Sequence, residues 1–172
     1  MRRLLRWGLT AVLAALALLL LAFVLLWAAW TWRQLRESWS LHRTAFGEVA
    51  PGAERLESRA RLGLFQGFGC SYSVVDLPDG TPDQAPTRDI AIPNAVLRAG
   101  DWRAGPSPFF APGAGYERDP LSFCAHDHWS DTLTARIRDA AHDPASWWIE
   151  GYEESGLYAP AHGLALIVRR SD

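Results

Sequence analysis

The chain has 172 residues with 17 basic and 19 acidic side chains, enough for one compact domain beyond an apolar N-terminal stretch. Without Arg2, Arg3 and Arg6, which precede that stretch, 14 basic residues stand against 19 acidic ones, a formal net charge of −5. Such a domain lacks the clustered positive charge that binds a phosphate backbone, so we expect no nucleic-acid partner.

The first predicted element is a transmembrane helix over residues 8–32. No charged residue interrupts Gly8–Trp32. A helix of this length spans roughly 37 Å at about 1.5 Å per residue, whereas the hydrocarbon core of a bilayer is about 30 Å thick. A cleaved signal sequence would have a shorter apolar run that ends in small residues, but this run ends in tryptophans. We therefore expect an uncleaved anchor that crosses the lipid bilayer, with residues 1–7 as a cytoplasmic tail.

The location of the domain is predicted from the flanks of this helix and from residue usage. Arginines flank both ends in nearly equal number, so the positive-inside rule gives little preference. The very short N-terminal tail, and the tendency of large domains to translocate regardless of charge, favour a domain outside the cytoplasm. All basic residues are arginine, which is typical of a GC-rich bacterial genome. We therefore expect a single-pass protein of the bacterial inner membrane with a periplasmic C-terminal domain.

Residues 33–50 are predicted to continue the helix beyond the membrane until Pro51 and Gly52 stop it. Apolar and aromatic residues recur here at spacings of three and four, the pattern of one helix face. The stripe consists of Trp32, Leu35, Trp39, His42, Phe46 and Val49. It is shorter than a coiled coil requires, so we expect it to pack on the protein's own domain or on a partner. Leu35, Trp39 and Phe46 are the candidate partner contacts.

Residues 51–172 are predicted to form a small α+β domain with a middle rich in loops, Pro and Gly. Its first element would be a short helix over residues 54–64. A half-buried strand over Phe68–Val74 would follow, because apolar residues alternate there with Gly and Ser. In that strand Cys70 points the same way as the apolar side chains.

The stretch from Pro78 to Pro120 contains eight of the eleven prolines and is predicted to be mostly loop. Only Ile90–Leu97 has the pattern of a strand. Aromatic residues among the Gly and Pro residues either form an exposed surface for a partner or fold back into the core, and the second alternative is the commoner one in small domains. The candidate contacts are Trp102, Phe109 and Phe110.

The C-terminal part is predicted to contain one helix and two strands. Ser130 has the position of an N-cap, and the helix would end at His142–Pro144. Strands are predicted at Trp147–Tyr152 and Leu164–Val168. The connection between them contains Glu153 and Glu154, and such a pair at a turn is more often solvated than catalytic.

The stretch FCAHDHWSD, residues 123–131, has two incompatible interpretations. On a strand, Cys124, His126 and His128 would share one face and could converge on a zinc ion. Asp131 is a further candidate ligand. The signal is weak, because no CxxC or HExxH motif accompanies it.

The alternative is a disulfide between Cys70 and Cys124, the two cysteines of the chain. An even number of cysteines outside the cytoplasm favours pairing, and closing this 54-residue separation would stabilise the fold by roughly 4 kcal/mol. Because a disulfide sulfur is not the thiolate that zinc requires, Cys124 can have one role only. We expect the disulfide, with His126, His128 and Asp131 held in reserve as a weaker metal site.

No catalytic motif or cofactor-binding loop is found in the sequence, so no cofactor is expected, zinc being the alternative. The leading hypothesis is a non-enzymatic accessory or interaction module, held at the membrane and contacting a membrane or periplasmic protein. One alternative is a membrane-tethered, metal-dependent hydrolase that uses His126 and His128. Another is a periplasmic small-molecule binding or sensor domain, with a pocket walled by the Trp-rich C-terminal strands.

Overall fold

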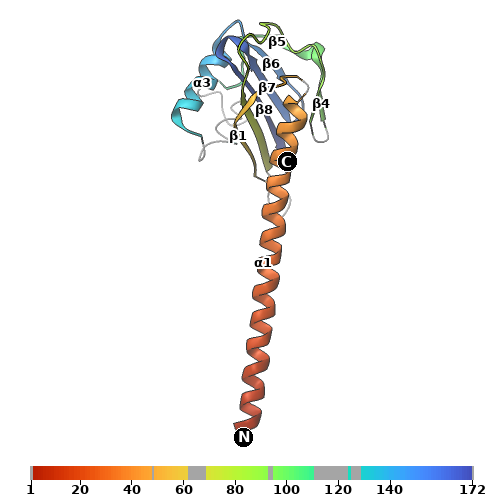
Figure 1. Ribbon diagram of the computed structural model, residues 1–172, viewed down its shortest axis with the longest axis vertical. Helices are drawn as coiled ribbons and strands as arrows, with labels where there is room; N and C mark the ends of the chain where they lie inside the picture. Colours follow the sequence, from red (N-terminus) through yellow and green to blue (C-terminus); the bar gives the residue numbers. More distant parts are fainter. Residues whose placement is uncertain are drawn as a thin grey trace. The chain divides into compact units, whose positions relative to one another are not determined.

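The computed structural model describes residues 2–47, 49–61, 69–92, 95–110, 124 and 129–171. It divides into two compact units, Met1–Gln34 and Leu35–Asp172. A single helix, α1 (Arg2–Phe46), forms the first unit and contributes its last turns to the second (Figure 1). From Val12 onward α1 is long and apolar enough to cross a membrane, with a mean hydropathy of 2.9 in its most apolar part. The helix ends at Phe46, four residues before the predicted limit, and is followed by Gly47, a poor helix former.

The second unit is an α+β domain built on a six-stranded antiparallel sheet of order β1-β2-β8-β7-β6-β5. The strands of this sheet are β1 (Glu54–Arg61), β2 (Gly69–Asp76), β5 (Arg103–Ala104), β6 (Trp147–Glu150), β7 (Glu154–Ala159) and β8 (Leu164–Ser171). A hairpin of β3 (Ile90–Ile92) and β4 (Ala95–Leu97) forms a second small sheet. Among the described residues, further helical elements are α3 (Asp131–His142) and the 3₁₀ turns η1 (Ala99–Asp101) and η2 (Pro160–His162). The α+β class predicted from the sequence is confirmed.

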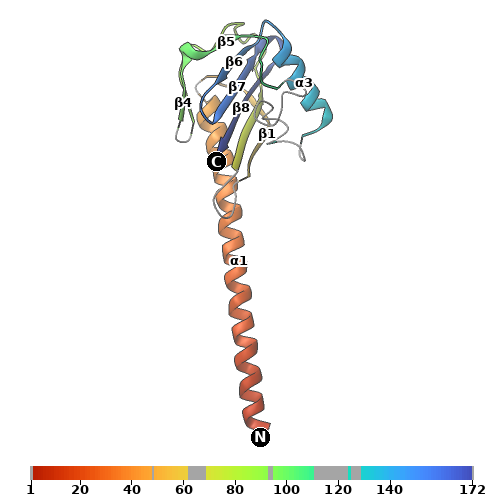
Figure 2. The same ribbon diagram turned by 180° about the vertical axis from the view of Figure 1, so that it is seen from behind.

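Both faces of the large sheet are covered (Figure 2). The helix α3 packs on one face, against residues such as Tyr72 and Val74 of β2. The last turns of α1 and the β3-β4 hairpin pack on the other, where Val75 of β2 lies. Successive strand residues point to opposite faces, and both faces are covered, so β2 is buried along nearly its whole length. The predicted strand is present, but it is buried on both faces and not on one.

The predicted short helix over residues 54–64 is wrong, since Glu54–Arg61 form β1 at the edge of the sheet. The segment pairs with β2 along its length, apart from a bulge that leaves Leu56 as an extra residue. Charged side chains lowered its apparent strand character, yet they are typical of edge strands that must not pair with other chains. Pairing with β2 overrides the local helical pattern.

The predicted connection between the two C-terminal strands is itself a strand, β7, and all six of its residues are buried. Gly156 lies at its centre, where a Cβ atom would come within 2.8 Å of Ile149 Cγ2 and 3.1 Å of Trp102 Cη2. A glycine therefore lets the Trp102 indole pack directly on the sheet. The helix predicted after Ser130 is confirmed as α3, and the Ser130 hydroxyl accepts a hydrogen bond from the Leu133 N–H at 3.2 Å.

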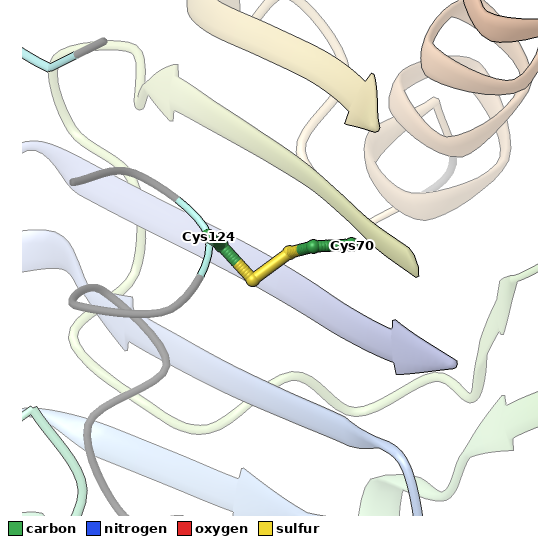
Figure 3. The surroundings of a disulfide bond; sticks show 2 residues. All are labelled: Cys70 and Cys124. Atoms are coloured by element: carbon green, nitrogen blue, oxygen red, sulfur yellow. A yellow bond between two sulfur atoms is a disulfide. The ribbon is translucent and has the colours of Figure 1, made fainter. Parts of the chain in front are cut away.

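The predicted disulfide is confirmed: Cys70, near the start of β2, is bonded to Cys124 (Figure 3). The two Cα atoms are 5.6 Å apart, within the usual range for a disulfide. Both residues are buried in the cluster beneath α3, at 6% and 7% exposure. The bond thus ties a distant part of the chain to this core.

Candidate interaction surface

The last turns of α1 differ in exposure along their length. Leu41, Ala45 and Phe46 are buried against the sheet, at 0%, 0% and 4% exposure. Leu35 and Trp39, earlier on the helix, are each 52% exposed. The spacing predicted one apolar stripe, but the structure turns its first part toward solvent and its last part inward.

Small hydroxyl side chains hold this part of α1 close to the sheet. The hydroxyl oxygens of Ser38 on α1 and Ser58 on β1 are 2.6 Å apart, and Ser58 also donates to the Ser38 carbonyl at 3.1 Å. One turn further along, His42 Nδ1 lies 3.0 Å from the Ser73 hydroxyl oxygen. Hydroxyls satisfied in this way allow a helix to pack against a sheet without leaving buried donors unpaired.

The His42–Ser73 pair has the residue types of a base and a nucleophile, but its placement is structural. Ser73 has 0% exposure at the centre of the sheet, so no substrate can reach its hydroxyl. Burial lowers the pKa of His42, and the positive charge of Arg55 lowers it further. The imidazole is therefore neutral at neutral pH and serves as a hydrogen-bonding partner.

An ionic cluster stands beside these contacts. The Arg169 guanidinium on β8 lies 3.7 Å from a carboxylate oxygen of Glu153 and of Glu154, and 4.0 Å from one of Glu37 on α1. The Glu154 side chain is only 9% exposed. The expectation of a solvated Glu153-Glu154 turn is thus wrong for Glu154, whose carboxylate faces an arginine side chain that is only 15% exposed.

The exposed part of α1 is joined to the edge strand by a stacked pair. The Arg55 guanidinium of β1 lies 4.7 Å from the centre of the Trp39 ring, a cation–π contact. Leu56, the bulge residue that follows Arg55, is 38% exposed. We call Leu35, Trp39, Arg55 and Leu56 the Trp39 surface. The sequence pattern identified its two α1 residues but missed the two on β1, whose strand was taken for a helix.

The other candidate partner contacts lie in the core. For Trp102, Phe109 and Phe110 this is the alternative expected to be the commoner one, and Phe46 packs on the protein's own domain. Phe46, Trp102, Phe109 and Phe110 are 4%, 8%, 6% and 0% exposed. Phe109 packs on Trp148 with ring centres 5.5 Å apart, and Trp102 packs on Tyr158 at 6.3 Å. The physical reason is that a domain of this size needs large aromatic side chains to fill the two sides of its sheet.

The predicted metal ligands are only partly described. His126 and His128 lie outside the described residues, and Asp131 is exposed in the first turn of α3. The Cys124 sulfur is held in the disulfide and is not free to bind zinc. Within the described residues, no group of three or more His, Cys, Asp or Glu side chains is arranged to hold a metal.

No protein-family model matches the chain, and no curated protein or solved structure is found to be similar to it.

Proposed function

We propose that the protein is a single-pass protein of the bacterial inner membrane whose periplasmic domain is a non-enzymatic accessory module that binds a membrane or periplasmic protein. The observation that carries this proposal is the Trp39 surface. Tryptophan and arginine are the side chains that most often dominate protein interfaces, and here they are stacked on each other at the domain surface.

The continuity of α1 supports membrane anchoring of the domain as part of this role. The apolar part of the helix continues without a break into turns whose side chains fill the domain core, including the fully buried Leu41. Residues 32–41 are helical throughout. The buried disulfide further supports an oxidising compartment, such as the periplasm.

A hydrolase that uses His126 and His128 has no supporting observation among the described residues. The Ser–His pair that the structure does contain is inaccessible. We therefore keep the interaction role as the proposed function.

Site-specific photo-crosslinking in native membranes tests the partner interface. A photoreactive phenylalanine analogue at position 39 of the full-length chain is expected to cross-link to another protein. Tyr152, 93% exposed, is the matched control position, and it should cross-link much less. Equal cross-linking from both positions would overturn the proposal. So would recovery of the protein as a lone monomer together with full function of Trp39→Ala in cells.

Alkylation with and without prior reduction tests the compartment. The intact mass of the membrane-extracted protein should show labelling of Cys70 and Cys124 only after reduction. Direct labelling of both thiols would contradict a periplasmic location.

A further inference from the structure

We propose that a cavity next to Tyr158 binds a short-chain monocarboxylate. This inference goes beyond the proposed partner interaction and does not rest on it. The cavity is not the pocket of Trp-rich C-terminal strands expected from the sequence, since no tryptophan among the described residues lines it. The cavity has a volume of about 150 Å³ and is walled by Val49, just after α1, by the loop of residues 82–88 and by Tyr158 of β7.

The polar groups around this cavity are mostly donors of hydrogen bonds. Four polar side chains line it, those of Gln84, Thr87, Arg88 and Tyr158, and no carboxylate does so among the described residues. Within the described part of the chain, none of the four makes a side-chain hydrogen bond or ion pair. The neighbouring Asp89 carboxylate accepts a hydrogen bond from the Ala99 N–H at 2.8 Å and does not line the cavity.

Gln84, Thr87 and Arg88 are exposed to solvent while Tyr158 is buried, so an anion bound here replaces water as the acceptor for these donors. A guanidinium binds a carboxylate through two parallel hydrogen bonds, and hydroxyl and amide donors can satisfy its remaining lone pairs. Burial raises the pKa of Tyr158, so its phenol stays protonated at neutral pH and can donate. A single guanidinium matches a monoanion better than a dianion such as phosphate.

The apolar walls and the volume define the rest of the ligand. Pro82, Ala85, Pro86 and Val49 supply a hydrocarbon surface opposite the donors. A cavity of about 150 Å³ accommodates a molecule the size of benzene, about six heavy atoms. A carboxylate with a tail of two or three carbons, such as propionate or butyrate, fills this space.

Ligand-detected NMR on the full-length protein in a neutral detergent tests the proposal. Sodium propionate is titrated at constant ionic strength, and propionamide, its uncharged analogue of nearly the same shape, is titrated in parallel. We expect saturable binding of propionate and at least about tenfold weaker binding of propionamide, since loss of the charge removes the charge-assisted bonds.

Two arginine variants make the assignment specific. Arg88→Gln is expected to weaken propionate binding at least about tenfold, whereas Arg98→Gln, which removes the same charge from an exposed position outside the cavity, should leave it unchanged. Thermal melting of each variant checks that it is folded. If Arg88→Gln melts early, the propionamide comparison still decides the question. Absence of saturable propionate binding, equal binding of propionamide, or wild-type binding by folded Arg88→Gln would each overturn the proposal.

Discussion

His42 and Ser73 show how one side chain can make the stability of the domain depend on pH. Burial and the nearby Arg55 lower the pKa of His42, so the folded state binds a proton less readily than the unfolded chain does. In the window between the lowered pKa and the unperturbed value of 6.5, the unfolded state holds more protons, and stability rises with pH. Protonation of His42 therefore lowers the free energy of unfolding by nothing above this window and by its full amount below it.

We therefore expect the free energy of unfolding to fall as the pH is lowered below about 6.5, with His42→Gln flattening the profile. Glutamine can still bond to Ser73 but does not titrate in this range. Denaturant unfolding of the detergent-solubilised protein at a series of pH values measures the effect. Asp143 does not titrate in this window. Hydrogen bonds from the Ala145 N–H and then from His162 lower the pKa of its carboxyl below the ordinary value of 3.8. An unchanged profile in His42→Gln would assign the pH dependence to another group.

Gly156 is a second residue whose role follows from its surroundings. In Gly156→Ala the new methyl group would lie 2.8 Å from Ile149 Cγ2 and 3.1 Å from Trp102 Cη2. Both neighbours are buried, so they cannot move aside freely, and we expect destabilisation of about 1–3 kcal/mol from overpacking. Gly100→Ala is the control, because no atom lies within 4 Å of its added Cβ. Equilibrium unfolding in denaturant should separate the two variants, and equal stabilities would refute the close packing of Trp102 on β7.

At the scale of single elements, α1 has two roles along its length. Its apolar part is suited to a bilayer, while Leu41, Ala45 and Phe46 complete one side of the sheet. This division explains why the stripe from Trp32 to Val49 is exposed in its first part and buried in its last part. Beyond residue 35, contact with the sheet determines which residues of the helix are buried.

Leu41→Ala tests the contribution of α1 to the domain. Leu41 is fully buried, so we expect a loss of about 2–5 kcal/mol in the free energy of unfolding. Leu35→Ala, at a half-exposed position of the same helix, should change stability by less than about 0.5 kcal/mol. Proteolysis of the domain in detergent gives a second readout, with Leu41→Ala cleaved much faster. Similar behaviour of the two variants would show that the last turns of α1 do not pack on the sheet.

At the scale of the whole molecule, the disulfide connects parts of the chain that lie far apart in sequence. It spans 54 residues between β2 and Cys124 and is buried in the core beneath α3. Chain-entropy arguments assign roughly 4 kcal/mol of stabilisation to a cross-link of this length. The bond should therefore account for a large share of the stability of a small domain.

Reduction is expected to lower the denaturation midpoint of the wild-type protein strongly. The double variant Cys70→Ser, Cys124→Ser should have the low midpoint already and should not respond to reductant. Thermal or denaturant unfolding with and without reductant measures both. A wild-type midpoint that is insensitive to reductant, with labelling confirming that the bond was broken, would contradict the stabilising role.

Local signals in the sequence were sufficient for several elements. The uncharged run predicts the apolar helix, Ser130 predicts the start of α3, and the cysteine count predicts the disulfide. These features depend on residues close together in the chain or, for the cysteines, on there being a single way to pair them.

Contacts in the folded domain determine which other segments become strands and which side chains are buried. The charged segment Glu54–Arg61 became a strand because β2 offered it a partner, and Glu154–Ala159 became one between β6 and β8 without an alternating pattern. The burial of Phe110 and the exposure of Trp39 depend on which surfaces the folded sheet leaves uncovered. The physical reason is that burial and strand pairing are set by contacts between residues distant in sequence, which no local periodicity contains.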